Sequence, residues 1–296
     1  YNAGANHFLI VGPYDHGATA SPYKPPTVKG YAIDPLAQLD SVALTYNWFD
    51  HVMRGGPKPA LLQDRVNYEV MGANLWRHAP SIERMGNRTL TLYLTDTKID
   101  DHYFLGHERP TKVGFLEQVV DFADRTTQNN LYPVRAIEEK VELTNGFKFV
   151  SEPFEEPVSF DGQLSGELNV TISKRDMDVT LSLYELTADA KWFNLSYYLA
   201  RASYANDMTR RELLKPGKKA TIPFDRTPLM SRQMARGSRL VLLLTVSKNS
   251  HAQINYGSGK DVSDESIEDA KTPLRVRWHT DSFVKVPLGT SPAAGT

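Results

Sequence analysis

Apolar residues follow two kinds of pattern along the chain, and the pattern changes near residue 86. Residues 7–11 form a short apolar run that ends at Gly12-Pro13. A run that is apolar on both faces and stops at a turn is typical of a parallel strand covered by helices on each side. Residues 66–70 alternate between apolar and polar side chains, which predicts a second strand.

One helix is marked clearly between these two strands. Asp34 can cap the amides of the first turn, Pro35 suits the first helical position, and Arg54-Gly55-Gly56 ends the helix. Apolar residues recur at intervals of three and four, at Leu36, Leu39, Ala43, Tyr46, Phe49 and Met53. This spacing predicts a single helix with one apolar stripe packed against a core.

From about residue 89 the chain consists of short runs in which apolar and polar residues alternate. The runs lie at 90–94, 147–149, 168–172, 179–183, 274–278 and 284–288. Six or more such runs without a long helix predict an antiparallel β-sandwich of the jelly-roll type. We therefore expect α/β structure in residues 1–85, an all-β sandwich in 86–288, and a disordered tail in 289–296, which has no apolar pattern.

Composition excludes several classes of protein. With 296 residues, of which 41% are hydrophobic, the chain is long enough to bury a large core. Its net charge of -1 gives no sign of a nucleic-acid or anionic-membrane partner, and no apolar run is long enough to span a membrane. The absence of cysteine excludes disulfides, thiolate metal ligands and cysteine nucleophiles. None of these features identifies a cellular compartment.

Three stretches carry a family resemblance: "LIVGPYDHG" at 9–17, "WFDHVMRG" at 48–55 and "VMGANLWRHAP" at 70–80. They resemble the carboxy-terminal third of the catalytic domain in the cocaine esterase and X-prolyl dipeptidyl-peptidase (CocE/NonD) family. Its members are serine hydrolases of the α/β-hydrolase fold, followed by a non-catalytic jelly roll that is galactose-binding-like. The stretch from 147 to 170 is similar to that jelly roll. The resemblance implies that residues 1–85 are the carboxy-terminal piece of an α/β-hydrolase sheet.

The resemblance implies a catalytic role for His16, because the family's triad histidine lies in the motif that "GPYDHG" matches. In α/β-hydrolases the histidine follows a late strand and comes after the serine and the acid along the chain. Such a histidine takes the serine proton during attack and returns it to the leaving group. Tyr14 stands where the family often has an aromatic residue that lines an acyl or leaving-group pocket. The alternative for Tyr14 is a packing aromatic at the strand end.

The chain does not supply the other triad members. The nucleophile motif G-x-S-x-G is absent, no serine precedes His16, and Asp15 is the only carboxylate before it. We therefore expect the chain to be part of a longer serine hydrolase whose serine and aspartate lie upstream, and to be inactive alone. The expected reaction is cleavage of ester, amide or X-Pro peptide bonds through an acyl-enzyme, with no metal or other cofactor. Expected partners are a small-molecule or peptide substrate, the upstream segment and, through the jelly roll, a second copy of the chain.

A rival hypothesis makes the protein a non-catalytic β-sandwich module that binds carbohydrate or protein. Aromatic residues in the expected strands favour this hypothesis: Trp192, Tyr197 and Tyr198. A metal site at His102 and His107 is disfavoured, because their spacing matches no common ligand pattern and a polar loop is the simpler interpretation.

Overall fold

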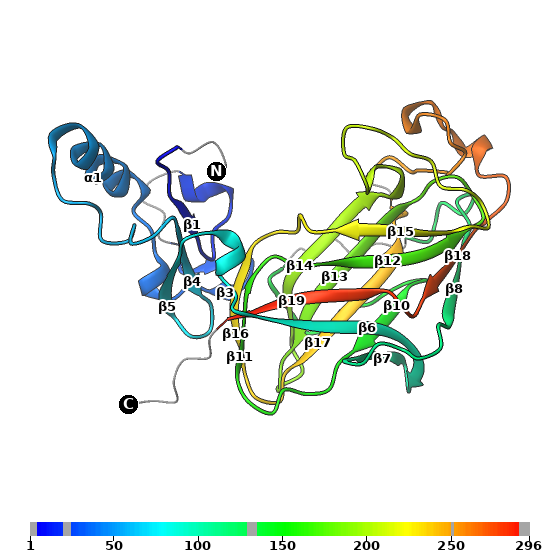
Figure 1. Cartoon of the computed structure of the whole chain (residues 1–296), viewed down its shortest axis with the longest axis horizontal. Helices are drawn as coiled ribbons and strands as arrows, with labels where there is room; N and C mark the ends of the chain where they lie inside the picture. Colours follow the sequence, from blue (N-terminus) through cyan, green and yellow to red (C-terminus); the bar gives the residue numbers. More distant parts are fainter. Residues whose placement is uncertain (1–4, 20–24, 129–134, 250–251, 290–296) are drawn as a thin grey trace.

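The computed structural model describes residues 5–19, 25–128, 135–249 and 252–289 (Figure 1). A smaller group of elements, which we call the N-terminal part, covers residues 5–85 and contains α1 (Ser41–Arg54). A larger β-structure, which we call the sandwich, covers residues 86–289. Figure 1 shows the two side by side.

The N-terminal part contains a three-stranded sheet in the order β1 (Leu9–Val11), β4 (Val66–Val70) and β5 (Leu75–Ala79). The predicted strands at 7–11 and 66–70 are both present. β1 is parallel to β4, and β5 is antiparallel to it. The residues of β1 are half-buried, because β1 lies at the edge of the sheet and is covered less completely than a central parallel strand. A short hairpin of β2 (Thr27–Val28) and β3 (Tyr31–Ala32) lies between β1 and β4 in the sequence.

The predicted single helix beginning at Asp34 is wrong, because the chain forms two helices there. Asp34 caps a 3-10 helix, η2 (Pro35–Ala37), by accepting a hydrogen bond from the Leu36 amide. The backbone is extended at Gln38, and Asp40 then caps α1 by accepting from the Ala43 amide at 2.9 Å. The predicted end is confirmed, since Gly55 takes the left-handed conformation that glycine adopts without strain.

The predicted packing of the helix stripe against a core is also wrong for this structure. No residue of α1 is buried. The helix contacts the sheet region through Trp48, whose ring meets that of Phe8 edge-on at 5.2 Å between centroids. Tyr46, Phe49 and Met53, which we call the α1 stripe, are 72%, 53% and 76% exposed.

Every alternating run predicted after residue 89 is a strand. The strands of the sandwich are β6 (Arg88–Ile99), β7 (His102–Gly106), β8 (Phe115–Val120), β9 (Ile137–Glu138), β10 (Phe147–Val150), β11 (Val158–Gly162), β12 (Ser165–Ile172), β13 (Asp178–Leu186), β14 (Trp192–Arg201), β15 (Lys219–Phe224), β16 (Met230–Met234), β17 (Arg239–Val246), β18 (Leu274–His279) and β19 (Phe283–Gly289). Gly289, in the tail predicted to be disordered, ends β19, and residues 290–296 lie outside the described residues.

Short 3-10 helices complete the described secondary structure. They are η1 (His16–Thr19), η3 (Ile82–Arg84), η4 (Ala202–Tyr204), η5 (Val262–Asp264) and η6 (Ile267–Asp269).

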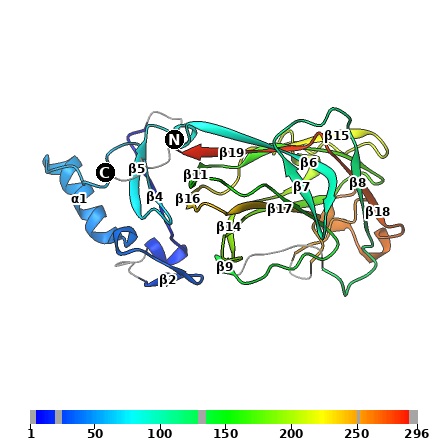
Figure 2. The same ribbon diagram turned by 90° about the horizontal axis from the view of Figure 1, so that it is seen from below.

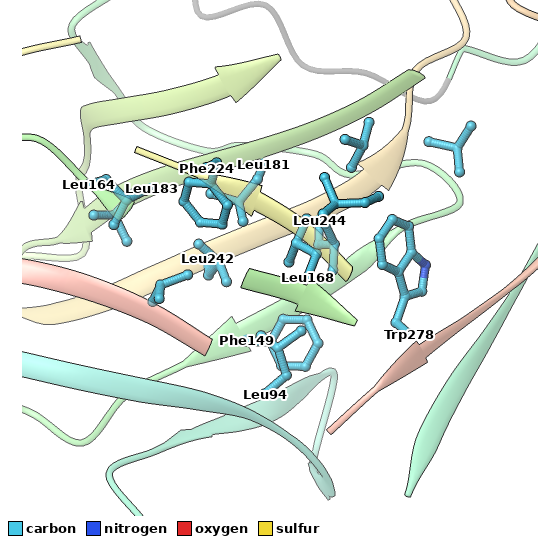
Figure 3. Close-up of a cluster of buried hydrophobic side chains, with 14 of the residues drawn as sticks. Leu94, Phe149, Leu164, Leu168, Leu181, Leu183, Phe224, Leu242, Leu244 and Trp278 are labelled. Carbon is cyan, nitrogen blue, oxygen red and sulfur yellow. The ribbon is translucent and has the colours of Figure 1, made fainter. Parts of the chain in front are cut away.

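The strands of the sandwich form two layers around one core (Figure 2). Strands β18, β12, β19 and β6 lie on one side, and β10, β17, β13 and β14 on the other. Leu168 from the first layer and Leu181 and Leu242 from the second are fully buried in the same cluster (Figure 3). Each such leucine contributes roughly 2 kcal/mol by leaving water, so this core holds the sandwich together.

Strand β16 joins the sandwich to the N-terminal part. Met71, directly after β4, donates its amide to the Ser231 carbonyl at 3.2 Å and accepts from the Gln233 amide at 2.9 Å. Beside this bridge the ring of Tyr31 meets that of Phe193 edge-on, with 5.6 Å between centroids. We call these contacts, of β3 with β14 and of the residue after β4 with β16, the seam.

Candidate functional site

His16 lies on the loop that leaves the carboxyl end of β1. Val11, the last residue of β1, is opposite Tyr68 in the parallel strand β4, so the loop emerges at the carboxyl edge of this strand pair. His16 is the first residue of η1 and is exposed. The imidazole of His16 is therefore exposed at this edge of the sheet.

Asp15 shapes the turn that carries His16. Its Oδ1 atom accepts a hydrogen bond from the Gly17 amide at 2.8 Å, which closes a short Asx turn around His16. One oxygen of this carboxylate is therefore occupied by a hydrogen bond from the backbone amide of Gly17. This geometry gives Asp15 a local role in the turn.

Tyr14 anchors the same loop to η2. Its hydroxyl donates to the Ala37 carbonyl oxygen at 2.8 Å, and its ring packs in a small apolar cluster with Ile33 and Ala37. The ring also crosses the backbone of Gly12 so closely that a Cβ atom at position 12 would lie 2.6 Å from it. These contacts correspond to the packing alternative for Tyr14, while its predicted pocket-lining role stays a prediction.

A polar network that the sequence pattern did not reveal fastens β1 to the other two strands. The Asn67 side-chain amide is fully buried and donates to the carbonyl oxygens of Leu9 at 3.3 Å and Asp64 at 2.7 Å. Its Oδ1 atom lies 2.8 Å from Nδ1 of His78 on β5. Burial lowers the pKa of His78. A neutral His78 fits this network, because it needs to supply one donor to Asn67.

No group of three or more histidine, aspartate or glutamate side chains in the described parts of the chain is arranged to hold a metal ion. His102 is the first residue of β7, so the predicted polar loop at this position is wrong, and its Nδ1 atom lies 3.2 Å from Asp101. Among the described helices, none is both long and apolar enough to cross a membrane.

A cavity of about 1390 Å³ opens between β14 and β15 at the side of the sandwich. Tyr197 and Tyr198 are in its lining, together with Tyr204 and Phe224, and the rings of Tyr198 and Phe224 stack at 4.8 Å. Trp192, the third aromatic residue of the rival hypothesis, is instead buried against Tyr184. We call this space the β14–β15 cavity.

A family model matches most of the chain. Residues 62–279 match the X-Pro dipeptidyl-peptidase C-terminal non-catalytic domain. The matched region includes β4, β5 and the sandwich through β18, and it begins after His16. The comparison with curated proteins found no match.

Solved structures of hydrolases share the fold. An aminopeptidase from a marine sediment archaeon, Thaumarchaeota archaeon, superposes with a TM-score of 0.78 at 18% identity over 96% of this chain and 49% of its own. An α-amino acid ester hydrolase gives 0.72 at 17% identity over 95% and 50%. A CocE/NonD family hydrolase from Staphylococcus aureus gives 0.62 at 13% identity over 95% and 49%. At these identities the likeness shows the fold, and the chain spans about half the length of each of these structures.

Proposed function

The chain belongs to the family of X-Pro dipeptidyl-peptidase C-terminal non-catalytic domains, and from this premise we propose that it is the carboxy-terminal part of a serine hydrolase. In this proposal an upstream segment carries the serine nucleophile and the aspartate of the triad. His16 completes the triad from the loop after β1. The likeness to three hydrolase structures over nearly the whole chain, including the N-terminal part, supports the proposal.

The chemistry assigned to His16 is general acid and base catalysis. The imidazole accepts the serine proton as the oxygen attacks the substrate carbonyl, and it donates that proton to the leaving alcohol or amine. Water then attacks the acyl-enzyme while His16 accepts the water proton, and the serine recovers its hydrogen when the acid product leaves. The exposed position of His16 at the carboxyl edge of β1 and β4 is the observation that carries this assignment.

The α1 stripe supports the existence of an upstream segment. An amphipathic helix normally turns its apolar side toward a core, whereas Tyr46, Phe49 and Met53 are directed to solvent here. β1 is likewise the edge strand of its sheet among the described residues. The similar structures are about twice as long as this chain, so a segment of comparable size is available in such proteins to cover the stripe and extend the sheet.

The proposed substrates are small esters, amides or peptides cleaved after an X-Pro pair. The sandwich is assigned the role of packing beside the catalytic domain and helping to wall the substrate pocket. The mechanism requires no cofactor, because serine, histidine and aspartate supply the nucleophile and the proton transfers.

The test uses the full-length protein that includes the upstream segment. Replacing His16 by Ala is expected to lower kcat for a simple aryl ester by about 1,000-fold or more, since a triad without its base loses several orders of magnitude. His102→Ala is the matched control, because His102 lies in the sandwich and is expected to leave turnover unchanged. A fluorophosphonate is expected to label the parent and to label His16→Ala much more slowly. Equal turnover of the parent and His16→Ala would reject the assignment.

The β14–β15 cavity favours a second candidate, a binding module for carbohydrate or protein. Its stacked Tyr198 and Phe224 and the exposed Tyr197 provide aromatic surface along an open cavity. Under this candidate the full-length protein fails to react with a fluorophosphonate and Tyr197→Ala weakens ligand binding. Reaction of an upstream serine with the fluorophosphonate would favour the hydrolase.

A further inference from the structure

Glu69 is a buried carboxyl group without a hydrogen-bond partner. It lies in the central strand β4 and is 1% exposed, and neither carboxyl oxygen has a partner among the described residues. The other deeply buried carboxylates at the junction are satisfied: Asp161 accepts from Ser159 and Ser231, and Glu185 accepts from Arg232. Burying an unpaired negative charge is costly, so the side chain of Glu69 is stable here as the neutral acid.

The cation that acts on Glu69 is already paired with another carboxylate. Arg232 of β16 donates from Nε to Glu185 at 2.7 Å, and its guanidinium stacks 3.9 Å above the ring of Phe193. The second oxygen of Glu185 accepts from the Ser238 hydroxyl. The Arg232 guanidinium therefore binds the Glu185 carboxylate and acts electrostatically on the Glu69 carboxyl group. Together Arg232, Glu185 and Glu69 carry no net charge only while Glu69 keeps its proton.

Two groups from the segment before α1 also interact with Glu69, and one of them, Asp34, opposes its ionisation. Tyr31 of β3 and Asp34, the cap of η2, both interact electrostatically with it. Burial is the main cause that raises the pKa of Glu69 to about 7, Asp34 raises it further, and Arg232 lowers it. Glu69 in turn contributes to a raised pKa of Tyr31, where burial is again the larger cause.

Glu69 is two residues from the bridge that joins β4 to the sandwich. The carbonyl and amide of Met71 bond to Gln233 and Ser231, the two neighbours of Arg232 in β16. An ionised Glu69 attracts Arg232 away from Glu185 and repels Asp34. Both changes act on the seam, and the second acts on η2, whose Ala37 carbonyl holds Tyr14 beside His16.

We propose that the protonation state of Glu69 controls how firmly the contacts of the seam are held. In its neutral form the contacts of the seam are kept and Asp34 of η2 meets no second negative charge there. Loss of the proton loosens these contacts, so the segment that supports the His16 loop becomes less firmly held as pH rises through neutrality. The proposal concerns the seam itself and holds whether or not His16 is catalytic.

The first test compares the parent with Glu69→Gln, which keeps the shape of the neutral acid and does not titrate. A folded-state pKa raised from 4.5 to about 7 stabilises the folded state fully below pH 4.5, and this advantage is lost progressively as pH rises from 4.5 to just above 7. Between pH 5.5 and 8.5 the folding equilibrium constant of the parent is expected to fall about 30-fold relative to Glu69→Gln. Glu142→Gln, an exposed control, is expected to follow the parent at every pH.

The second test locates the effect. Amide hydrogen exchange of residues 31–34, of Leu36 and Ala37 and of Gln233, corrected for the intrinsic pH dependence, is expected to be faster at pH 8 than at pH 6 in the parent and equal at both pH values in Glu69→Gln. Amides of the sandwich core, such as Leu181, are expected to stay protected throughout. Direct titration of the ¹³C-labelled Glu69 carboxyl in the parent gives an independent measurement should the variant not fold. A titration near 4.5, or exchange that is the same at both pH values, overturns the proposal.

Discussion

The guanidinium of Arg77 lies 3.1 Å from the carboxylate of Asp161, and this ion pair connects β5 of the N-terminal part with β11 of the sandwich. Asp161 is fully buried, and Arg77 is largely so. Burial raises the pKa of Asp161, while bonds from Ser231, Ser159 and Arg77 favour its charged form. The pair therefore holds two parts of the chain together at a position where an unpaired charge is costly.

Arg77→Ala is expected to destabilise the protein by about 3 kcal/mol, because it leaves a buried carboxylate without its cation. Urea unfolding measures this loss as a change in the free energy of unfolding. Arg275→Ala is the matched control, since Arg275 forms an ion pair of the same 3.1 Å length with Glu117 at the surface. Exposed pairs contribute little, so the control is expected to change stability by less than about 1 kcal/mol. Equal losses for the two variants would show that burial does not set the strength of the Arg77 pair.

Tyr14→Phe is expected to cost about 1 kcal/mol, because it removes the hydroxyl that donates to the Ala37 carbonyl. Chemical unfolding of the chain measures the difference. Tyr46→Phe removes an exposed hydroxyl from α1 and is expected to leave stability within about 0.5 kcal/mol of the parent. An unchanged stability of Tyr14→Phe would mean that the bond does not anchor the His16 loop.

Gly12→Ala is expected to destabilise the protein by about 1–3 kcal/mol, because the new Cβ atom would lie 2.6 Å from the Tyr14 ring. The reason can be tested with a double-mutant cycle. In a Tyr14→Ala background the ring is absent, so adding Gly12→Ala is expected to cost much less than it does in the parent. If unfolding experiments show that Gly12→Ala costs the same with and without the Tyr14 ring, the close contact with that ring is not the cause of the loss in stability.

Six strands of the sandwich, β6, β10, β12, β13, β18 and β19, could be predicted because apolar residues that face the core recur along them. Such burial requires apolar residues at every second position, as at Leu168, Val170 and Ile172, and this pattern is visible without a structure. The start of α1 could not be predicted in the same way. Asp34-Pro35 and Asp40-Ser41 are both acceptable starts, and the choice depends on the extended backbone at Gln38.

The contacts between the two parts of the chain could not be predicted from the sequence pattern, for a different reason. Arg77 and Asp161 are 84 residues apart, and nothing local to either marks the other as its partner. Glu69 lies at a polar position of an alternating run, which predicts exposure, yet it is buried in the structure. The loop position of His16 was predictable, since a strand followed by Gly12-Pro13 marks where the strand ends.

Substitutions in the α1 stripe test whether this surface stays in water or is covered by another segment of the protein. In the chain of 296 residues Phe49→Asp is expected to change the free energy of unfolding by less than about 0.5 kcal/mol, because Phe49 is 53% exposed. Trp48→Ala is the contrasting variant on the same helix. It removes the ring contact with Phe8 and is expected to cost about 1–3 kcal/mol in the same measurement.

In the full-length protein the order of these effects is expected to change. If the upstream segment covers the α1 stripe, Phe49→Asp places a charge in an apolar contact and lowers stability by about 2 kcal/mol or more, because the phenyl burial is lost and the carboxylate is desolvated. Thermal unfolding of the full-length protein and of the 296-residue chain, each with and without Phe49→Asp, measures the difference between the two settings. A variant that is equally harmless in both would show that the stripe remains in water and that the upstream segment packs elsewhere.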